Sequence, residues 1–180
     1  MTGSQSISSG VNATRTILCT LAVLGLCALP SLSGAQELAI TTDALTRQAD
    51  LIVVGKVSGL KAGWASDRSR ILTTVTLAVD QTLKGKAGSG FVTIVVPGGE
   101  VDGVGELYSH TARFSKDEDV VVFAAKDKKG DFRVTGGSEG KVSIRRDEIS
   151  GRPRISDGMN LDDFTNRIKS AVQTQESETK

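Results

Sequence analysis

Apolar and polar residues alternate along much of the chain after position 50, and this alternation predicts β-strands. In residues 71–83, Ile71, Val75 and Leu77 share one parity, and threonines and Asp80 occupy the other. A period of two is the signature of a strand with one buried face, and a run this long is typical of a strongly coiled strand. Residues 120–125 are apolar on both parities, which predicts a central strand covered on both faces. Further strands are expected at 51–57, 91–96, 132–134 and 142–144.

Glycines and polar residues separate these strands and predict their connections. Gly55 interrupts an apolar run, which predicts a bulge or a bend. The polar residues 59–70 predict a loop or hairpin tip, and residues 100–116 predict a long surface loop because they show little periodicity. Residues 136–140 are glycine-rich but lack the Lys-Ser/Thr ending of a phosphate-binding loop, so a tight hairpin is expected there.

Two segments with helical features flank the strands. Thr42 is expected to cap a brief helical turn over residues 43–49. Asn160 is expected to cap a C-terminal helix within residues 159–173, followed by a frayed tail over 174–180. We expect the apolar stripe of this helix to cover an open end or edge of the β domain. The residues at helical spacing are Leu161, Phe164, Ile168 and Val172.

Residues 1–35 have the pattern of a secretory signal peptide. Arg15 is the only charge before an apolar run over residues 17–29, which is interrupted only by one threonine and one glycine. Such a run gives a helix of about 20 Å, too short for a bilayer core of about 30 Å. Small residues follow and place the expected cleavage before Gln36. The mature chain is therefore expected to be secreted or periplasmic, with no membrane span.

Composition narrows the class of protein further. Cys19 and Cys27 both lie within the expected signal peptide, so the mature chain has no disulfide or thiolate ligand and depends on its apolar core. Lysine and arginine total 22 against 21 aspartate and glutamate residues, and this balance argues against a nucleic-acid-binding module. An apolar content of 38% argues against a disordered chain.

Few residues offer catalytic or metal-binding chemistry. His110 is the only histidine, and the sequence holds no G-x-S-x-G elbow, so no enzyme is predicted. Glu100, Asp102 and Glu106 carry oxygen ligands but do not fit the spacing of a calcium loop, so neither a metal nor a cofactor is predicted. Four arginines without interleaved aromatic residues predict a solvated basic loop rather than a nucleic-acid site. They are Arg145, Arg146, Arg152 and Arg154.

Several motifs resemble a group of small exported bacterial β-proteins. These proteins combine an ADIVVVGxV strand, an LKG turn, a PGG loop and a late VxGGxxGK segment. Here residues 49–57, 83–85, 97–99 and 134–141 match these motifs, and the match covers residues 42–172. The resemblance implies an association with secreted zinc metalloproteases of the matrixin type.

The strand order also looks like the OB-fold of the tissue inhibitors of metalloproteinases. This likeness implies a partly open five-stranded barrel with a binding face. Those inhibitors place an N-terminal cysteine on the protease zinc, whereas the chain from Gln36 contains no cysteine. The zinc-chelating mechanism is therefore not carried over.

Taken together, the sequence predicts an all-β protein: an OB-like antiparallel barrel of five to six strands over residues 36–158, with a short N-terminal helical turn and a C-terminal helix. We expect an exported, non-enzymatic binding module, an inhibitor or accessory of a secreted metalloprotease. The alternatives are a glycan- or cell-wall-binding domain and a structural envelope protein. Trp64 is expected either to contact a partner or to fold back as a lid over the barrel. The expected contact residues are Trp64, Pro97, Gly98, Gly99, Glu100, Tyr108, His110 and Arg113.

Overall fold

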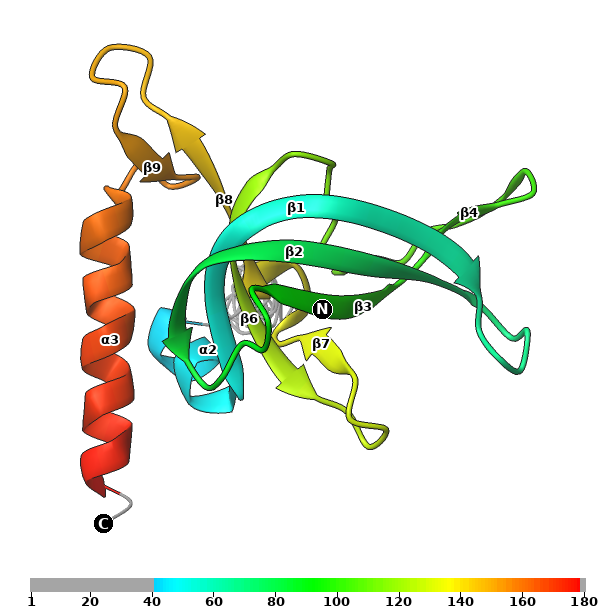
Figure 1. The fold of residues 1–180 in the computed structure, drawn as a ribbon, viewed down its shortest axis with the longest axis horizontal. Coiled ribbons are helices and arrows are strands. Elements are labelled where there is room, and N and C mark those ends of the chain that lie inside the picture. Colours follow the sequence, from blue (N-terminus) through cyan, green and yellow to red (C-terminus); the bar gives the residue numbers. More distant parts are fainter. Residues whose placement is uncertain (1–40, 179–180) are drawn as a thin grey trace, which may run out of the picture. The chain divides into compact units, whose positions relative to one another are not determined.

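The computed structural model describes residues 41–178, in which β-strands predominate (Figure 1). The expected signal peptide and both cysteines lie outside the described residues. The two helices are α2 (Thr42–Gln48) and α3 (Leu161–Glu178), and neither is both long and apolar enough to cross a membrane. The strands are β1 (Leu51–Trp64), β2 (Ile71–Lys84), β3 (Phe91–Pro97), β4 (Gly99–Val101), β5 (Val104–Glu106), β6 (Asp119–Lys126), β7 (Phe132–Val134), β8 (Lys141–Arg146) and β9 (Pro153–Ile155).

Five strands close into a barrel in the order β1-β2-β3-β7-β6, with β6 pairing back onto β1. The predicted all-β, OB-like barrel with a short N-terminal helix and a C-terminal helix is confirmed. The pairs are antiparallel except for β3 and β7, which run parallel and meet at Ile94 and Phe132. A ring of five strands cannot alternate in direction throughout, because five is odd. β8 and β9 extend the sheet beyond β6.

Apolar side chains of one parity fill the barrel. Val75 and Leu77 of β2 face the interior and are fully buried, as the alternation in 71–83 predicts. The other buried members of this inner core come from β1, β3 and β6: Leu51, Val53, Val57, Val92, Ile94, Val96, Val120, Val122 and Ala124.

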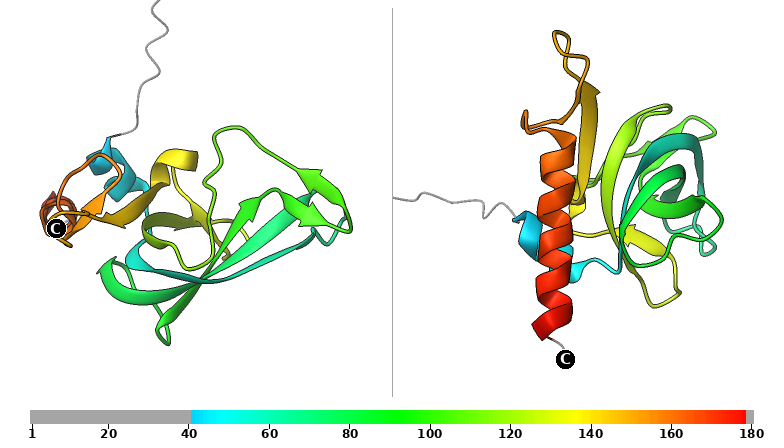
Figure 2. Two further views of the ribbon diagram at one scale, coloured as in Figure 1. Left: turned by 90° about the horizontal axis from the view of Figure 1, so that it is seen from above. Right: turned by 60° about the vertical axis from the view of Figure 1, so that its left-hand side comes forward.

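A second core lies on the outer wall of the barrel. Ile52 of β1 and Phe123 of β6 have the opposite parity to the inner core and pack with Phe164 and Ile168 of α3. The rings of Phe123 and Phe164 meet edge to face, with their centroids 6.5 Å apart. The prediction that the central strand is covered on both faces is thereby confirmed. Of the two expected positions of the C-terminal helix, the edge is the one observed: α3 packs along the outer wall and against β9, the last strand of the sheet, and does not cover an open end (Figure 2).

The helix ends differ in detail from the expected boundaries. The cap of α2 is Thr41 and not Thr42, since the Thr41 hydroxyl accepts a hydrogen bond from the Ala44 amide at 3.2 Å. Asn160 caps α3 as predicted, by accepting from the Asp162 amide at 2.8 Å. The helix continues to Glu178, beyond the expected boundary at 173. In this part of α3, the Gln175 side chain accepts a hydrogen bond from the Lys84 ammonium of β2 at 2.9 Å, which links the end of the helix to the barrel.

Beyond Lys56, where its pairing with β6 ends, β1 continues along β2 alone (Figure 1). We call residues 59–64 of β1 and residues 71–76 of β2 the arm; residues 72–76 also pair with β3 on their other side. The predicted loop over 59–70 is therefore wrong for its first half, and only residues 65–70 form the turn. Pairing with a regular partner strand outweighs the weak strand propensity of glycine and lysine in this segment.

Gly55 marks a bulge in β1, as predicted. The register of β1 against β2 shifts between Val54 and Gly55. A side chain at Gly55 would collide with the carbonyl oxygen of Ala78, so the close approach of the two backbones requires glycine.

The expected long loop over residues 100–116 contains a β-hairpin. β4 and β5 pair antiparallel from Gly99↔Glu106 to Val101↔Val104. Residues 107–118 then arch back to the barrel without forming a strand (Figure 2). Residues 137–140, expected within a tight hairpin, instead form a short 3-10 helix before β8.

Candidate functional site

A cavity of about 830 Å³ opens between the arm, the β4–β5 hairpin and the loop over residues 107–114. We call this cavity the mouth. Val75 and Val96 belong both to its lining and to the inner core, so the mouth lies at an open end of the barrel. Its lining consists of Leu60, Ala62, Thr73, Val75 and residues 96–100, 105–108 and 111–114.

The Pro97–Gly98–Gly99 segment forms one wall of the mouth because it crosses the inner face of the arm at close range. The Thr73 hydroxyl donates to the Gly98 carbonyl at 2.6 Å. Gly99 has a φ of 136°, and a Cβ atom there would lie 2.5 Å from Thr73 Oγ1 and 3.0 Å from Ala62 Cβ. Only glycine fits this backbone and this contact, so the Gly-Gly pair fixes where β4 begins.

Glu106 ties the far side of the mouth to the arm. One of its carboxylate oxygens accepts from the Ile71 amide at 2.8 Å and from the Tyr108 hydroxyl at 3.0 Å. The hydrogen bond to Glu106 raises the pKa of the Tyr108 phenol, because ionisation would remove the donor and bring two negative charges together. The arm therefore positions the aromatic ring at the rim of the mouth.

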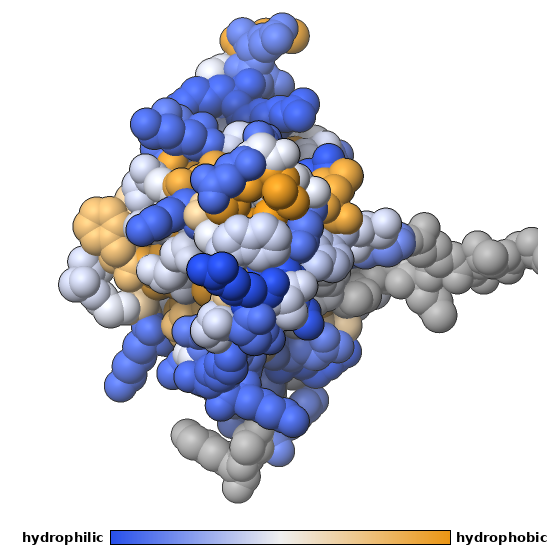
Figure 3. Space-filling view, turned by 90° about the vertical axis from the view of Figure 1, so that its right-hand side faces the viewer, coloured by the Kyte–Doolittle hydropathy of each residue, from blue (hydrophilic) through white to orange (hydrophobic). Residues whose placement is uncertain are grey.

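The rim exposes apolar side chains to water. Leu107 is 76% exposed, and Leu60 on the arm is 41% exposed. Val104 and Tyr108 are also exposed. Figure 3 views this end of the molecule and shows apolar side chains (orange) grouped between polar ones (blue). A concave apolar cavity with an exposed apolar rim is typical of sites that bind a ligand or a partner protein.

The arm also has an open strand edge beside the mouth. β6 pairs with β1 only as far as Lys56, and among residues 41–178 no strand other than β2 pairs with the segment 59–64. The Ala65 amide donates to the Arg70 carbonyl, so Ala65 turns its backbone groups toward β2. In an antiparallel ladder every second residue bonds to the same neighbour, so Leu60 and Ala62, which have the other parity, turn their backbone groups toward the open edge. Such an edge can pair with an extended chain.

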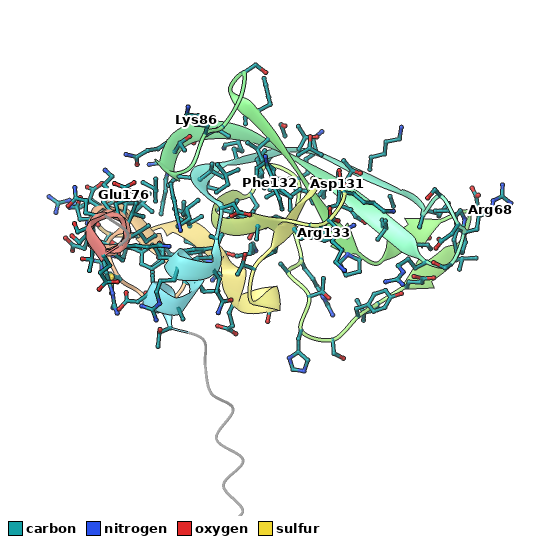
Figure 4. All side chains as sticks on the ribbon, turned by 90° about the horizontal axis from the view of Figure 1, so that it is seen from below. Arg68, Lys86, Asp131, Phe132, Arg133 and Glu176 are labelled. Carbon is teal, nitrogen blue, oxygen red and sulfur yellow. The ribbon has the colours of Figure 1, made fainter. Side chains whose placement is uncertain are left out.

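A second cavity, of about 690 Å³, lies on the outer face of β2 and β3. We call it the outer groove. Trp64 lines it from the end of the arm and Arg70 from the turn over residues 65–70. Asp131 and Arg133 line it from the other side, where Figure 4 shows them near each other. The remaining lining residues are Lys61, Ala62, Gly63, Ala65, Ser66, Asp67, Ser69, Leu72, Thr74, Thr93, Val95 and Lys129.

The structure brings six of the eight expected contact residues together in the mouth. They are Pro97, Gly98, Gly99, Glu100, Tyr108 and Arg113. Trp64 lines the outer groove instead, because the segment expected to be a loop is a strand that ends there. His110 is exposed, and its carbonyl accepts from the Ser138 amide at 2.8 Å, but its side chain is not part of the mouth lining.

The sequence reasoning missed Leu60 and Leu107, the exposed leucines of the mouth. Leu60 and Ala62 are apolar residues at alternate positions directly after the expected strand 51–57. This alternation could have suggested that the strand continues past Gly59. No periodicity marks Leu107, because it follows a three-residue strand and precedes an irregular loop.

A partly buried polar cluster lies near the base of the arm. Glu118 accepts hydrogen bonds from the Lys141 ammonium and, at 2.7 Å, from the Ser143 hydroxyl. Burial on its own would raise the pKa of the Glu118 carboxyl, but these bonds and one from the Ser115 amide hold the pKa below its ordinary value. Lys141 is thus the counterion of a carboxylate, which suits a structural clamp better than a base acting on Ser143.

Among residues 41–178, no group of three or more His, Cys, Asp or Glu side chains is arranged to hold a metal ion. Glu100, Asp102 and Glu106 do not form such a group, and Glu106 is engaged by Ile71 and Tyr108. Neither a protein-family model nor a curated protein sequence matches the chain.

Proposed function

We propose that this protein is a non-enzymatic binding module that holds a segment of a partner protein in the mouth. The observation that carries the proposal is the apolar cavity with Leu60, Leu107 and Tyr108 exposed at its rim. Holding these side chains in water is unfavourable, and a partner that covers them would recover roughly 25 cal/mol per Å² of buried apolar surface.

The open edge of β1 indicates the conformation of the bound segment. Leu60 and Ala62 offer backbone donors and acceptors at the edge, and their side chains line the mouth. An extended segment can pair with this edge while every second side chain enters the cavity. The proposed partner segment is therefore extended, with apolar residues at alternate positions.

The proposed partner is an exported protein. The expected signal peptide would direct the chain out of the cytoplasm, and the resemblance described above suggests a secreted metalloprotease, with the chain as its inhibitor or accessory. The rim exposes apolar side chains, and the chain from Gln36 has no cysteine that could bind zinc. We therefore propose that the rim contacts the surface of the protease and does not chelate its zinc.

The test uses three baits that begin at Gln36: wild type, Leu107→Asp in the rim, and Ile149→Asp at an exposed apolar residue outside the mouth. Each bait is incubated with the soluble culture medium of the source organism, and captured proteins are identified by mass spectrometry. Wild type and Ile149→Asp should retain one protein in stoichiometric amount, and Leu107→Asp should lose it.

If that protein is a zinc protease, its inhibition by the chain is then measured. Equal capture by Leu107→Asp, or no capture by the folded wild type, would contradict the proposal.

A second candidate function is glycan binding in the outer groove. OB-folds bind oligosaccharides and oligonucleotides on the face of strands 2 and 3, and the outer groove occupies that face. Trp64 supplies an aromatic ring, and it is the only tryptophan in the chain.

Its fluorescence therefore reports on this groove alone. Titration with soluble cell-wall oligosaccharides should shift the emission in wild type and in Leu107→Asp, and Arg70→Ala should weaken the response. An unchanged emission would exclude this candidate.

A further inference from the structure

The β8–β9 hairpin is a second exposed feature, separate from the mouth. It projects from the sheet at the end next to the start of α3, while the arm extends from the opposite side of the barrel (Figure 1). Residues 147–152 form its tip. Its exposed basic residues are Arg145, Arg146, Arg152 and Arg154.

Residues 145–154 hold four arginines against Asp147 and Glu148, which leaves the hairpin a net charge of +2. Among residues 41–178, only Arg154 of the four has an ion pair, with Asp147 at 3.2 Å. Arg145 lies directly opposite Arg154 in the β8–β9 ladder. Like charges in directly opposed positions destabilise a strand pair, so the hairpin concentrates positive charge at some cost to its own stability.

An isoleucine stands at the tip of this basic hairpin. Ile149 is 98% exposed, the highest exposure among the large apolar residues described. The turn that presents it is well ordered by hydrogen bonds, because the Asp147 carboxylate accepts from the Ile149 amide at 3.2 Å and from the Ser150 amide at 2.7 Å. The Gly151 amide also donates to the Asp147 carbonyl at 2.8 Å. The backbone of the tip is therefore preorganised with the side chain outward.

We infer that this hairpin docks on an anionic membrane surface. Ile149 enters the boundary between headgroups and acyl chains, and the arginines on both strands bind lipid phosphates. Guanidinium groups bind phosphate oxygens in a forked geometry, and basic residues next to a bilayer are attracted by its anionic lipids.

The exposed isoleucine favours a membrane over a nucleic acid as the partner. Single-stranded nucleic acids bind through aromatic side chains that stack on bases, and this hairpin contains none. An aliphatic side chain at the tip, ahead of the arginines on the two strands, matches a bilayer, which offers an apolar layer beneath a charged one. Because the arm extends from the opposite side of the barrel, docking through the hairpin would leave the mouth open to a partner (Figure 1).

The experiment measures sedimentation of the chain with vesicles of equal parts phosphatidylglycerol and phosphatidylcholine, and with vesicles of phosphatidylcholine alone. The chain begins at Gln36, so that the apolar run before it does not contribute. Residues 39–180 form one compact unit that contains both cores, so this chain holds every contact described.

Wild type should bind the anionic vesicles and not the neutral ones. Arg145→Gln/Arg152→Gln should weaken binding about 30-fold, since each basic residue near the surface contributes about fivefold. Ile149→Ser should weaken it about tenfold through lost apolar burial.

Arg68→Gln/Lys86→Gln removes the same charge at exposed positions outside the hairpin, both labelled in Figure 4, and should bind like wild type. Leu107→Asp should also bind like wild type, which separates this inference from the function proposed for the mouth.

Three results would overturn the inference. Equal binding of wild type to both kinds of vesicle would show that lipid charge is not recognised. Equal losses in the hairpin pair and in the Arg68/Lys86 pair would show that only net charge matters. Tighter binding to a short DNA duplex than to the vesicles, unaffected by Ile149→Ser, would assign the arginines to nucleic acid instead.

Discussion

The two halves of β1 belong to one strand but have different neighbours. Residues 51–56 pair with β2 on one side and β6 on the other, and they are covered by the inner core and by α3. Residues 59–64 pair with β2 alone, and their side chains line the mouth and the outer groove. The first half of β1 thus contributes to the hydrophobic cores, and the second half contributes lining residues to the candidate sites. Burial of a strand residue therefore depends on the elements that lie beside the strand.

The largest expected effect lies in the buried half. Ile52→Ala should lower the free energy of unfolding by about 3 kcal/mol, because it leaves a cavity between the barrel wall and α3. The midpoint of urea denaturation measures this loss. In the exposed half, Leu60→Ala should change stability by no more than about 0.5 kcal/mol. Similar losses from the two substitutions would break the comparison.

Gly99 tests how closely the PGG segment lies on the arm. Gly99→Ala should cost about 2 kcal/mol, because the left-handed backbone is strained and the new methyl group meets Thr73 and Ala62. Gly103→Ala is the matched control, since Gly103 also has a positive φ, of 78°, but nothing lies within 4 Å of a Cβ atom there. Only Gly99→Ala should also alter the mouth and reduce capture of the partner. If the two variants have the same melting temperature in thermal unfolding, the close contact at Gly99 does not contribute to stability.

The Glu118 cluster lies where β1 leaves β6, since the Val57 amide donates to the Glu118 carbonyl at 2.9 Å. Glu118→Gln should cost about 1.5 kcal/mol at neutral pH by weakening the bonds from Lys141 and Ser143. The pKa of Glu118 is lowered by folding, so its contribution is present above the ordinary value of 4.5 and is lost as pH falls through the lowered pKa.

Urea melts at several pH values should therefore show the gap between wild type and Glu118→Gln narrowing in acid. Asp119→Asn is the control, because its ion pair with Lys56, at 3.2 Å, is largely exposed and should contribute little. A gap that is independent of pH would contradict the ion-pair clamp.

The smallest effect concerns the rim of the mouth and leaves stability almost unchanged. Tyr108 is the only tyrosine in the chain, so the absorbance of tyrosinate reports on it alone. Its pKa should lie above the ordinary value of 10.0 and return toward it in Glu106→Gln. Glu100→Gln should leave the titration unchanged. An ordinary pKa in wild type would show that Glu106 does not hold the ring at the rim.

The sequence predicted those elements whose pattern is local. The alternation in 71–77 matches the observed inner and outer faces of β2, whereas Leu83, expected on the inner face, packs in the outer core. The two-sided apolar character of 120–125 matches the two cores around β6. The PGG motif lies in the wall of the mouth. Trp64 could not be placed from its surroundings, because glycine and lysine around it suggest a loop and only the partner strand β2 makes the segment regular.

The local sequence pattern predicted β2, β3, β6, β7, β8 and the first half of β1, together with the bulge at Gly55 and the apolar stripe of α3, because these follow from alternation, chain sterics and helical spacing between near neighbours. The tertiary structure alone decided that α3 covers the outer wall, that β1 leaves the barrel as an arm, and that Leu60 and Leu107 meet at one cavity. These outcomes depend on which distant segments pair and which face each element presents to another. Packing between residues far apart in the chain determines these pairings and faces, and no local sequence pattern predicts them.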